Sequence, residues 1–599
     1  MIVKPLLAMK IAPVNSALPS PALFSTDWRP RDKPIVIRKV LVLAAVIVLF
    51  HSSALAQSAV GRHGAIATVD RIASQAGIDA MKKGGNAVDA AIAAALTLGV
   101  VNTYNSGIGG GCFILIRSAK GDFTCIDGRE TAPAAATADM YVRNGAVVSG
   151  LSETGALASG TPGELAACDL AVRTFGRLTL KEHLLAAAQI AEQGFPIDAR
   201  YAAALRDQMS MQWSNLFTSA AACAIFLNSN GTILTEGQIL RQPDLAKTYR
   251  AIAENGPEWF YDGPFARSTE QWMKAIGGIL TAADFSAYRA VVRKPISTTY
   301  RGYTIVSFPP PSSGGVHLLE ILNMLETRDF SNPRFTEADR VHFTVEAMKL
   351  AFADRAYWLG DSDFAKVPRG LIRKDYARSL AAKIDLTHAS VVTGAGQPPD
   401  ATGDVFSKHT THISAADAEG NWVAMTATIN TQFGSKVVIP GTGVVMNNQM
   451  DDFSAQPGVA NHFGLVGASA NAIAPGKRPL SSMSPAIVLK DNRPILAVGA
   501  AGGPTIISQT LLNIVNVVDL GMDAEKAIAQ PKFHHQWKPD ELRVEQNMEP
   551  ALVAEMAKRG HAIRQVKYLG AAQAVGLAPD GQGFLGAADP RVQGVALAW

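Results

Sequence analysis

The chain has 599 residues, of which 48% are hydrophobic and 18% are charged, and its formal net charge at pH 7 is +4. A chain of this length can bury a large core and is expected to form two or more folding units. Basic and acidic residues are interspersed without a long basic run, so the composition does not indicate a nucleic-acid partner.

Residues 1–56 are predicted to be an N-terminal extension and a secretory signal peptide. A basic lead that ends at Lys39 precedes an apolar run from Val40 to Phe50 and a small-residue stretch that ends at Ala56. This order is typical of a signal peptide, with cleavage expected after Ala56. A membrane anchor is the alternative, but the apolar run is too short to cross about 30 Å of hydrocarbon. The mature protein is therefore expected to be periplasmic or secreted.

Export would place the four cysteines in an oxidising compartment, where cysteines can pair. Cys112 and Cys125 flank the turn "AKGD" of an expected hairpin, and symmetric pairing about that turn puts Cys125 opposite Ile116. A disulfide between the two is not favoured, and buried free thiols are expected, as for Cys168 and Cys223. The chain has no Cys-x-x-Cys motif, which argues against a thiol-ligated zinc site.

The part before the linker is predicted to be mixed and then mostly helical. Residues 61–101 predict a short strand and helices that "KKGGN" interrupts, and residues 106–133 predict a glycine loop and a β-hairpin. An Ala-rich helical stretch follows from about residue 156 to 294, and "VSFPPPSSGGVHLLEIL" predicts a strand, a turn and a helix. Residues 387–404 contain turn formers without periodicity, which makes them the best linker candidate.

After the linker, short strand patterns alternate with turns. The strand patterns are "THISAAD", "NWVAMTATI", "GVVMNN", "SPAIVLK" and "PILAVGAAG", and the helix "TIISQTLLNIVNVVDLG" follows them. Strand and helix runs are segregated in this part of the chain, which favours a layered α+β architecture.

The stretch "KHTTHIS", residues 408–414, begins the first of these strands. If the hairpin that follows has a three-residue loop, Asp417 pairs with Asn421 and Thr410 lies opposite Thr428, at about 5 Å between Cβ atoms. A two-residue loop would shift the partner by one. In either register, two hydroxyl groups can meet at the edge of a sheet.

Three interpretations of this stretch differ in their chemistry. A threonine hydroxyl is a poor nucleophile without a base, but a cut just before Thr410 would free an α-amine with a pKa of about 7.7–8.0 that can serve as the base. A metal site would need His409 and His412 to converge, whereas residues three apart in a strand face opposite sides. An ordinary strand start is the third interpretation.

Taken with five later motifs, this stretch resembles the γ-glutamyltranspeptidase family: "TATINTQFG", "NNQMDDFSAQPG", "KRPLSSMSP", "GAAGG" and "PKFHHQWKPDELRVE". The similarity runs from about Gly61 to the C-terminus. It implies an N-terminal-nucleophile hydrolase, an α+β fold with a four-layer αββα sandwich built jointly from two subunits. By resemblance, one precursor cuts itself between His409 and Thr410 and gives a heterodimer of a large subunit, residues 57–409, and a small subunit, residues 410–599.

The resemblance also assigns roles to residues around the nucleophile, Thr410. Thr428 matches the threonine that hydrogen-bonds the nucleophile hydroxyl, and the backbone N–H groups of Gly502 and Gly503 match an oxyanion hole, in which one donor is worth about 2.7–4 kcal/mol. The residues that match the ligands of a γ-glutamyl group are Arg129, Ser481 and Ser482 for its α-carboxylate, and Asn430, Gln449 and Asp452 for its α-amine. Guanidinium suits a carboxylate because it donates two parallel hydrogen bonds. Each residue alone would more often be a turn, a bend or a surface charge, but together they meet every charge requirement of one ligand.

Two residues depart from the family pattern. The segment "SAQPGVANHFGLVG" resembles the family's lid over the glutamyl pocket, and Phe463 stands where some bacterial members have a tyrosine. Phenylalanine can cover the pocket but has no hydroxyl to bond Asn430. Lys436 stands where a small residue is expected, and it is a candidate for altering acceptor access or substrate preference.

The resemblance implies an enzyme that cleaves the γ-glutamyl amide of glutathione and related compounds through a γ-glutamyl-threonine ester. Water, an amino acid or a peptide would then take the glutamyl group, and this chemistry needs no metal or organic cofactor. One alternative is an amidase of the same fold that acts on other acyl groups, such as glutaryl side chains of β-lactams. Asp452 argues against that, because a glutaryl group has no α-amine. Another alternative is an exported solute-binding or structural protein, against which the complete catalytic set argues.

Overall fold

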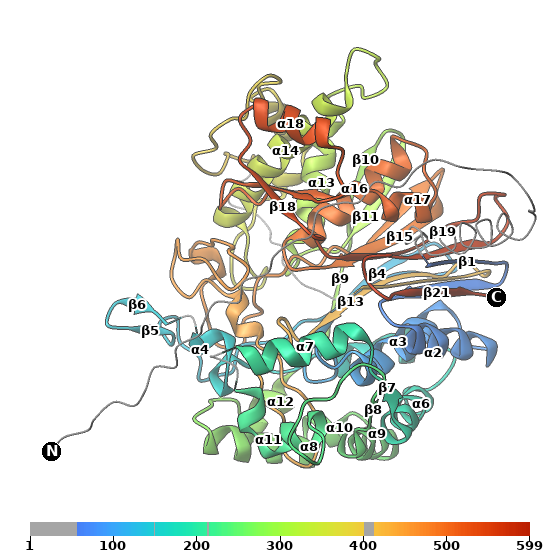
Figure 1. The fold of residues 1–599 in the computed structure, drawn as a ribbon, viewed down its shortest axis with the longest axis vertical. Helices are drawn as coiled ribbons and strands as arrows, with labels where there is room; N and C mark the ends of the chain where they lie inside the picture. Colours follow the sequence, from blue (N-terminus) through green and yellow to red (C-terminus); the bar gives the residue numbers. More distant parts are fainter. Residues whose placement is uncertain (1–56, 149, 212–214, 400–411) are drawn as a thin grey trace, which may run out of the picture. The chain divides into compact units, whose positions relative to one another are not determined.

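Two seven-stranded sheets lie face to face, with helices on the outer face of each (Figure 1). The structure is a computed structural model that describes residues 57–148, 150–211, 215–399 and 412–599. Strand neighbours in both sheets run antiparallel. This arrangement confirms the predicted α+β fold with four αββα layers.

The first sheet contains the hairpin that follows the linker. Its strands, in spatial order, are β21 (Val595–Ala598), β2 (Gly64–Thr68), β12 (His412–Asp417), β13 (Trp422–Thr428), β3 (Gly111–Arg117), β4 (Phe123–Gly128) and β9 (Val291–Arg293). The strands β12 and β13 therefore lie between β2 and β3, which come from the part of the chain before the linker.

The second sheet is built from both parts of the chain in the same way. Its strands, in spatial order, are β1 (Gln57–Gly61), β20 (Phe584–Ala588), β19 (Ala571–Leu577), β15 (Arg493–Ala501), β14 (Ala486–Lys490), β11 (Tyr303–Ser307) and β10 (Ile296–Tyr300). Pairs of strands from before and after the linker occur twice here, between β1 and β20 and between β11 and β14.

Alternation of side chains along β3 shows how the sheets are packed. Ile114 and Ile116 join the core beneath the helices, whereas Phe113 and Leu115 join the core between the two sheets. Such strands are apolar on both faces because both faces are buried. Between the sheets, the ring of Phe113 stacks on Phe308 with centroids 4.2 Å apart.

Helices from residues 71–287, which include most of the Ala-rich part, cover the first sheet. They are α2 (Arg71–Lys82), α3 (Ala87–Val101), α4 (Gly150–Glu153), α5 (Glu164–Phe175), α6 (Leu180–Gln193), α7 (Ala199–Ser210), α8 (Ala220–Phe226), α9 (Pro243–Asn255), α10 (Glu258–Tyr261), α11 (Pro264–Ala275) and α12 (Ala282–Ala287). Helix α3 is buried along its whole length and begins at Asn86, whose side chain accepts hydrogen bonds from Val88 N and Asp89 N. The predicted helix break at "KKGGN" is confirmed.

A second group of helices covers the other sheet. They are α13 (Ser313–Leu325), α14 (Glu337–Trp358), α15 (Lys374–Ala381), α16 (Thr505–Val518), α17 (Ala524–Ala529) and α18 (Pro550–Lys558). Small strands complete the fold: β5 (Val142–Arg143) with β6 (Ala146–Val147), β7 (Phe195–Pro196) with β8 (Ile239–Leu240), and β16 (Phe533–His534), β17 (Leu542–Glu545) and β18 (Ile563–Val566) in one sheet. Within the described ranges, no helix is both long enough and apolar enough to cross a membrane.

Two predictions about strands were wrong in detail. "GVVMNN" forms only an isolated bridge, Val438 with Val445, and residues with left-handed backbones stand close to both ends of this short pairing, Lys436 (φ 66°) before Val438 and Gly443 (φ 68°) before Val445. In the hairpin of β3 and β4, Cys125 lies opposite Leu115 and not Ile116, because a five-residue loop, residues 118–122, separates the strands. All four cysteines are free, as predicted, but only Cys112, Cys125 and Cys168 are buried, whereas Cys223 is partly exposed. Residues 387–399 of the predicted linker contain no helix or strand.

Candidate active site

The hairpin of β12 and β13 has the register that a three-residue loop predicts. His412 pairs with Thr426, and Asp417 N donates a hydrogen bond to Asn421 O at 3.1 Å. Thr428, the last residue of β13, pairs with Gly111 on its other side. The predicted nucleophile Thr410 and its neighbour His409 lie outside the described residues, so the nucleophile and the cut site remain predictions.

His412 does not point toward a metal site. Its ring is fully buried between the sheets, with Nδ1 3.2 Å from Thr426 Oγ1 and Nε2 2.9 Å from Ser414 Oγ. Burial lowers the pKa of His412 to about 3, so the ring is neutral at physiological pH. Nor do three or more His, Cys, Asp or Glu side chains gather as a possible metal site anywhere in the described part of the chain.

Thr428 and Asn430 form the turn that leaves β13. Thr428 Oγ1 accepts a hydrogen bond from Asn430 N at 2.8 Å, and Asn430 has a left-handed backbone with φ 80°. The Asn430 side chain donates to Asn448 O at 3.0 Å, which ties this turn to the segment that carries Gln449 and Asp452. The predicted partner of the nucleophile and a predicted ligand of the substrate amine are thus neighbours.

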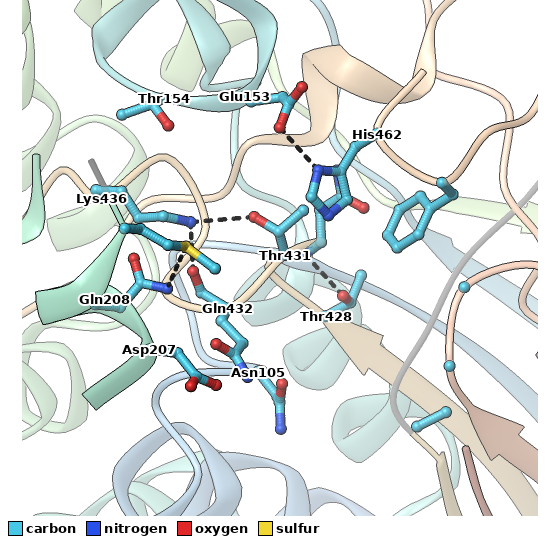
Figure 2. Close-up of a pocket in the computed structure, with 16 residues that line it drawn as sticks. Asn105, Glu153, Thr154, Asp207, Gln208, Thr428, Thr431, Gln432, Lys436 and His462 are labelled. Atoms are coloured by element: carbon cyan, nitrogen blue, oxygen red, sulfur yellow. Dashed lines mark hydrogen bonds and ion pairs between the residues drawn. The ribbon is translucent and has the colours of Figure 1, made fainter. Parts of the chain in front are cut away.

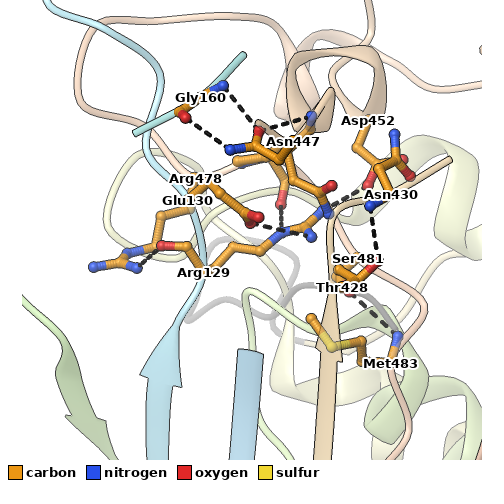
Figure 3. Close-up of polar contacts among 12 residues, drawn as sticks. Arg129, Glu130, Gly160, Thr428, Asn430, Asn447, Asp452, Arg478, Ser481 and Met483 are labelled. Carbon is orange, nitrogen blue, oxygen red and sulfur yellow. Dashed lines mark hydrogen bonds and ion pairs between the residues drawn. The ribbon is translucent and has the colours of Figure 1, made fainter. Parts of the chain in front are cut away.

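Arg129 and Asp452 form a fully buried ion pair (Figure 3). Arg129 follows β4, and its Nη2 lies 2.6 Å from Asp452 Oδ2, across 323 residues of sequence. The pair contains the two groups that were predicted to bind the α-carboxylate and the α-amine of one ligand. A ligand that carries both charges can separate this pair and still give each partner a new counter-charge, which limits the desolvation penalty of binding.

Several buried groups that the sequence did not single out hold this pair in place. Glu130 Oε2 is 3.5 Å from Arg129 Nη1, and burial raises the pKa of Glu130 to about 8, so its carboxyl is mostly protonated at neutral pH. Tyr288 Oη donates to Arg129 O at 2.6 Å, and Asn471 Nδ2 donates to Asp452 O at 2.8 Å. These contacts fix the backbone on both sides of the ion pair.

Gln449, Ser481 and Ser482 are also fully buried in this region. Gln449 lies one turn before Asp452 in the 3₁₀ helix Gln449–Asp452, and its side-chain amide has no hydrogen-bond partner within the described ranges. A buried amide without a partner is rare in a folded protein, which makes Gln449 a candidate ligand contact. Ser481 Oγ accepts a hydrogen bond from Met483 N at 3.2 Å.

Gly502 and Gly503 follow β15 and precede helix α16. Both have left-handed backbones, with φ 137° and 60°. A Cβ on Gly503 would lie 2.7 Å from the ring of Phe463, and one on Gly502 would lie 2.5 Å from Thr505 Oγ1. Glycine is therefore required at both positions for conformational and for steric reasons.

A cavity of about 530 Å³ joins five of the predicted residues: Thr428, Asn430, Phe463, Gly502 and Gly503 (Figure 2). Its other lining residues were not predicted, apart from Lys436: Asn105, Glu153, Thr154, Asp207, Gln208, Met211, Thr431, Gln432, His462 and Ala501. Of the other predicted residues that the structure describes, five are buried and do not line this cavity: Arg129, Gln449, Asp452, Ser481 and Ser482. The site therefore has an open part next to Thr428 and a buried part around Arg129.

The cavity wall carries four charged or titratable side chains: Glu153, Asp207, Lys436 and His462. His462 Nδ1 lies 2.7 Å from Glu153 Oε2, and this hydrogen bond raises the pKa of His462. The neighbouring Phe463 ring meets His462 edge-on, with centroids 5.2 Å apart. The position of Phe463 beside Gly503 is compatible with the predicted lid.

The four-layer fold defines an N-terminal-nucleophile hydrolase with a pocket at the end of β13. A family model described as Gamma-glutamyltranspeptidase matches residues 73–599. The chain belongs to the γ-glutamyltranspeptidase family.

Three known proteins place the chain within this group. It is 44% identical over 532 residues to a glutathione hydrolase proenzyme of Escherichia coli strain K12. This alignment covers 88% of this chain and 90% of that protein. The crystal structure of a cephalosporin acylase from Bacillus halodurans matches with a TM-score of 0.80 and 28% identity, over 90% of this chain and 97% of that one. The γ-glutamyltranspeptidase of Helicobacter pylori matches with a TM-score of 0.51 and 38% identity, over 53% of this chain and 90% of that one.

Proposed function

We propose that this protein is an exported, self-processing enzyme that cleaves the γ-glutamyl amide of glutathione and related compounds and passes the glutamyl group to water or to an amine. The observation that carries the proposal is the buried Arg129–Asp452 pair, to whose segment Asn430 is joined by a hydrogen bond to Asn448 O. A γ-glutamyl group ends in an α-carboxylate and an α-ammonium. Arg129 can bind this carboxylate and Asp452 can bind this ammonium in place of the ion pair between them.

The reaction begins at Thr410. Its hydroxyl oxygen attacks the γ-carbonyl carbon while its own α-amine takes the proton, and the N–H groups of Gly502 and Gly503 bind the oxyanion. The C–N bond then breaks, and the amine leaves with that proton. Water or an acceptor amine next attacks the ester, which releases the glutamyl group and restores the threonine hydroxyl.

Maturation uses the same hydroxyl. The hydroxyl oxygen of Thr410 attacks the carbonyl carbon of His409, the C–N bond between the two residues breaks, and the freed nitrogen of Thr410 takes the proton that the hydroxyl loses. Water then hydrolyses the resulting ester, which leaves residues 57–409 and residues 410–599 as two chains. Strand pairing supports a stable heterodimer after the cut, because β12 is bonded to β2 and β13 to β3 across the two predicted chains. The predicted signal peptide supports a periplasmic or secreted location.

An amidase for other acyl groups is the second candidate, because one similar structure is a cephalosporin acylase. Asp452 favours the γ-glutamyl reaction, since a glutaryl group would leave this carboxylate without an ammonium partner. Comparison of initial rates with γ-glutamyl and glutaryl 4-nitroanilides tests the choice. A preference for the glutaryl compound would overturn the proposal.

Intact mass spectrometry tests the self-processing part. The wild-type protein should give two chains that join at His409 and Thr410, and incubation with a γ-glutamyl substrate should add one glutamyl group to the smaller chain. Thr410→Ala should stay a single chain without activity. Two chains from that variant would refute self-cleavage by Thr410.

A further inference from the structure

Lys436 occupies an unusual position in the cavity wall. Its side chain is largely buried, its backbone is left-handed with φ 66°, and it lines the same cavity as Thr428, Gly502 and Gly503. A left-handed backbone and a buried ammonium group both cost stability. A glycine would avoid both costs, so the lysine calls for an explanation beyond the fold.

The ammonium group of Lys436 is solvated by neutral oxygens. Its Nζ donates to Gly434 O at 2.8 Å. It also donates to Thr431 Oγ1 at 3.2 Å and to Gln432 O, two residues that Figure 2 shows beside Lys436. Neutral oxygens orient an ammonium group but do not cancel its charge. Lys436 forms no ion pair in the part of the chain that the structure describes.

Neither of the two acidic side chains that line the cavity, Glu153 and Asp207, contacts the ammonium group of Lys436. Glu153 is hydrogen-bonded to His462, and it contributes only a longer-range attraction to Lys436. Asp207, near the end of α7, lines the same cavity and forms no ion pair with any residue that the structure describes. Within the described ranges, a ligand group that enters this space therefore meets one cation, Lys436, and one anion, Asp207, that form no ion pair.

The position of the cavity indicates which part of the substrate enters it. In the proposed reaction Arg129 and Asp452 hold the glutamyl end, and the oxyanion glycines line the cavity itself. The amine side of the scissile amide must then extend into the cavity. In glutathione this side is a dipeptide that ends in a carboxylate, and amino acid and peptide acceptors carry a carboxylate as well.

We propose that Lys436 is the specificity residue that binds the carboxylate of the leaving dipeptide and of amino acid or peptide acceptors. This inference rests on the proposed γ-glutamyl reaction and names the class of amine that the enzyme prefers. The carboxylate would replace Thr431 Oγ1, which at 3.2 Å is the longest contact of the ammonium group, and would form a charge-assisted hydrogen bond in a partly dry site. Asp207 would oppose this preference by repulsion.

Matched substrates separate this role from a structural one. Glutathione is compared with its C-terminal amide, and γ-glutamyl-3-carboxy-4-nitroanilide with γ-glutamyl-4-nitroanilide. Lys436→Met should lower kcat/KM for each carboxylate substrate by about tenfold or more and leave the neutral partner within about twofold. Lys436→Arg should keep most of the preference, and Asp207→Asn should increase it.

Lys436→Gly is a second variant in case the methionine variant does not fold, because glycine favours the left-handed backbone. An equal loss on charged and neutral substrates, or no change on either, would overturn the proposal. Calorimetry with cysteinylglycine and its amide gives a readout independent of catalysis. If the wild type cleaves no γ-glutamyl substrate, the proposed function fails, whereas tighter binding of cysteinylglycine that Lys436→Met abolishes would still support the carboxylate site.

Discussion

Asp452→Asn tests the central electrostatic argument because it removes one charge and keeps the shape. In the wild type, Asp452 Oδ2 lies 2.6 Å from Arg129 Nη2, and both side chains are fully buried. Removing one partner of a buried ion pair costs about 3–5 kcal/mol, since the other charge stays buried alone. Glu130 can offset part of this cost.

The offset by Glu130 follows from its surroundings. Burial raises its pKa to about 8, with repulsion from Asp452 as a smaller cause, and its Oε2 lies 3.5 Å from Arg129 Nη1. Without the Asp452 charge, the pKa of Glu130 should fall and its carboxylate should become the partner of Arg129. We therefore expect a loss of about 3 kcal/mol in the free energy of unfolding, at the lower end of the range for a broken buried pair.

The effect on activity should depend on the acyl group. A γ-glutamyl substrate loses the partner of its ammonium, which is worth about 2 kcal/mol or more and lowers kcat/KM about 30-fold or more. A glutaryl substrate has no ammonium and should lose much less. Urea unfolding and rates with both anilides measure the two effects.

Asp451→Asn is the matched control, since Asp451 accepts a hydrogen bond from Ser152 Oγ at 2.7 Å and does not pair with Arg129. It should leave the ratio of γ-glutamyl to glutaryl activity close to the wild-type value. An unchanged ratio in Asp452→Asn, or the same change in both variants, would refute the role of Asp452 as the counter-charge of the substrate ammonium.

Two further predictions concern Gly503 and His462. Gly503→Ala should lower kcat/KM about 100-fold or more, because the new Cβ would lie 2.7 Å from the Phe463 ring and would disturb an oxyanion donor. Gly441→Ala is the control: Gly441 also has a left-handed backbone, but no atom lies within 4 Å of its Cβ position. This control variant should be less stable than the wild type and keep its activity. The hydrogen bond to Glu153 raises the pKa of His462, so this residue's contribution to stability should be complete below its unfolded pKa of about 6.5 and lost as the pH rises through its folded pKa. Urea midpoints of wild type and His462→Gln from pH 5 to 9 should therefore converge at high pH, and a gap that widens with pH would contradict this sign.

The hairpin of β12 and β13 was predictable because its information is local. A turn with Gly420 in a left-handed conformation separates two strands whose lengths set the register, so the pairing of Asp417 with Asn421 follows from the loop length alone. The same reasoning failed for "GVVMNN", which forms only an isolated bridge. The left-handed backbone of nearby Lys436 could not be predicted, because lysine rarely adopts it.

The buried part of the site was not predictable as a contact. Arg129 and Asp452 were identified as separate ligands of one substrate, but they are 323 residues apart, and only the packed sheets bring them within 2.6 Å. Asp207 was not identified at all. It lies on α7 in an Ala-rich helical stretch, and its place in the cavity depends on how that helix packs over the sheet.

The interleaved strands determine the order in which folding and cleavage of the chain can occur. Residues 412–428 supply β12 and β13, which have partners from earlier in the chain on both sides. If residues 410–599 were made alone, these strands would expose unpaired edges, which favour aggregation. Folding must then come before the cut, and the single chain serves as its own template for assembly. The finished enzyme, once unfolded, should not refold from its two separate chains with the efficiency of the precursor.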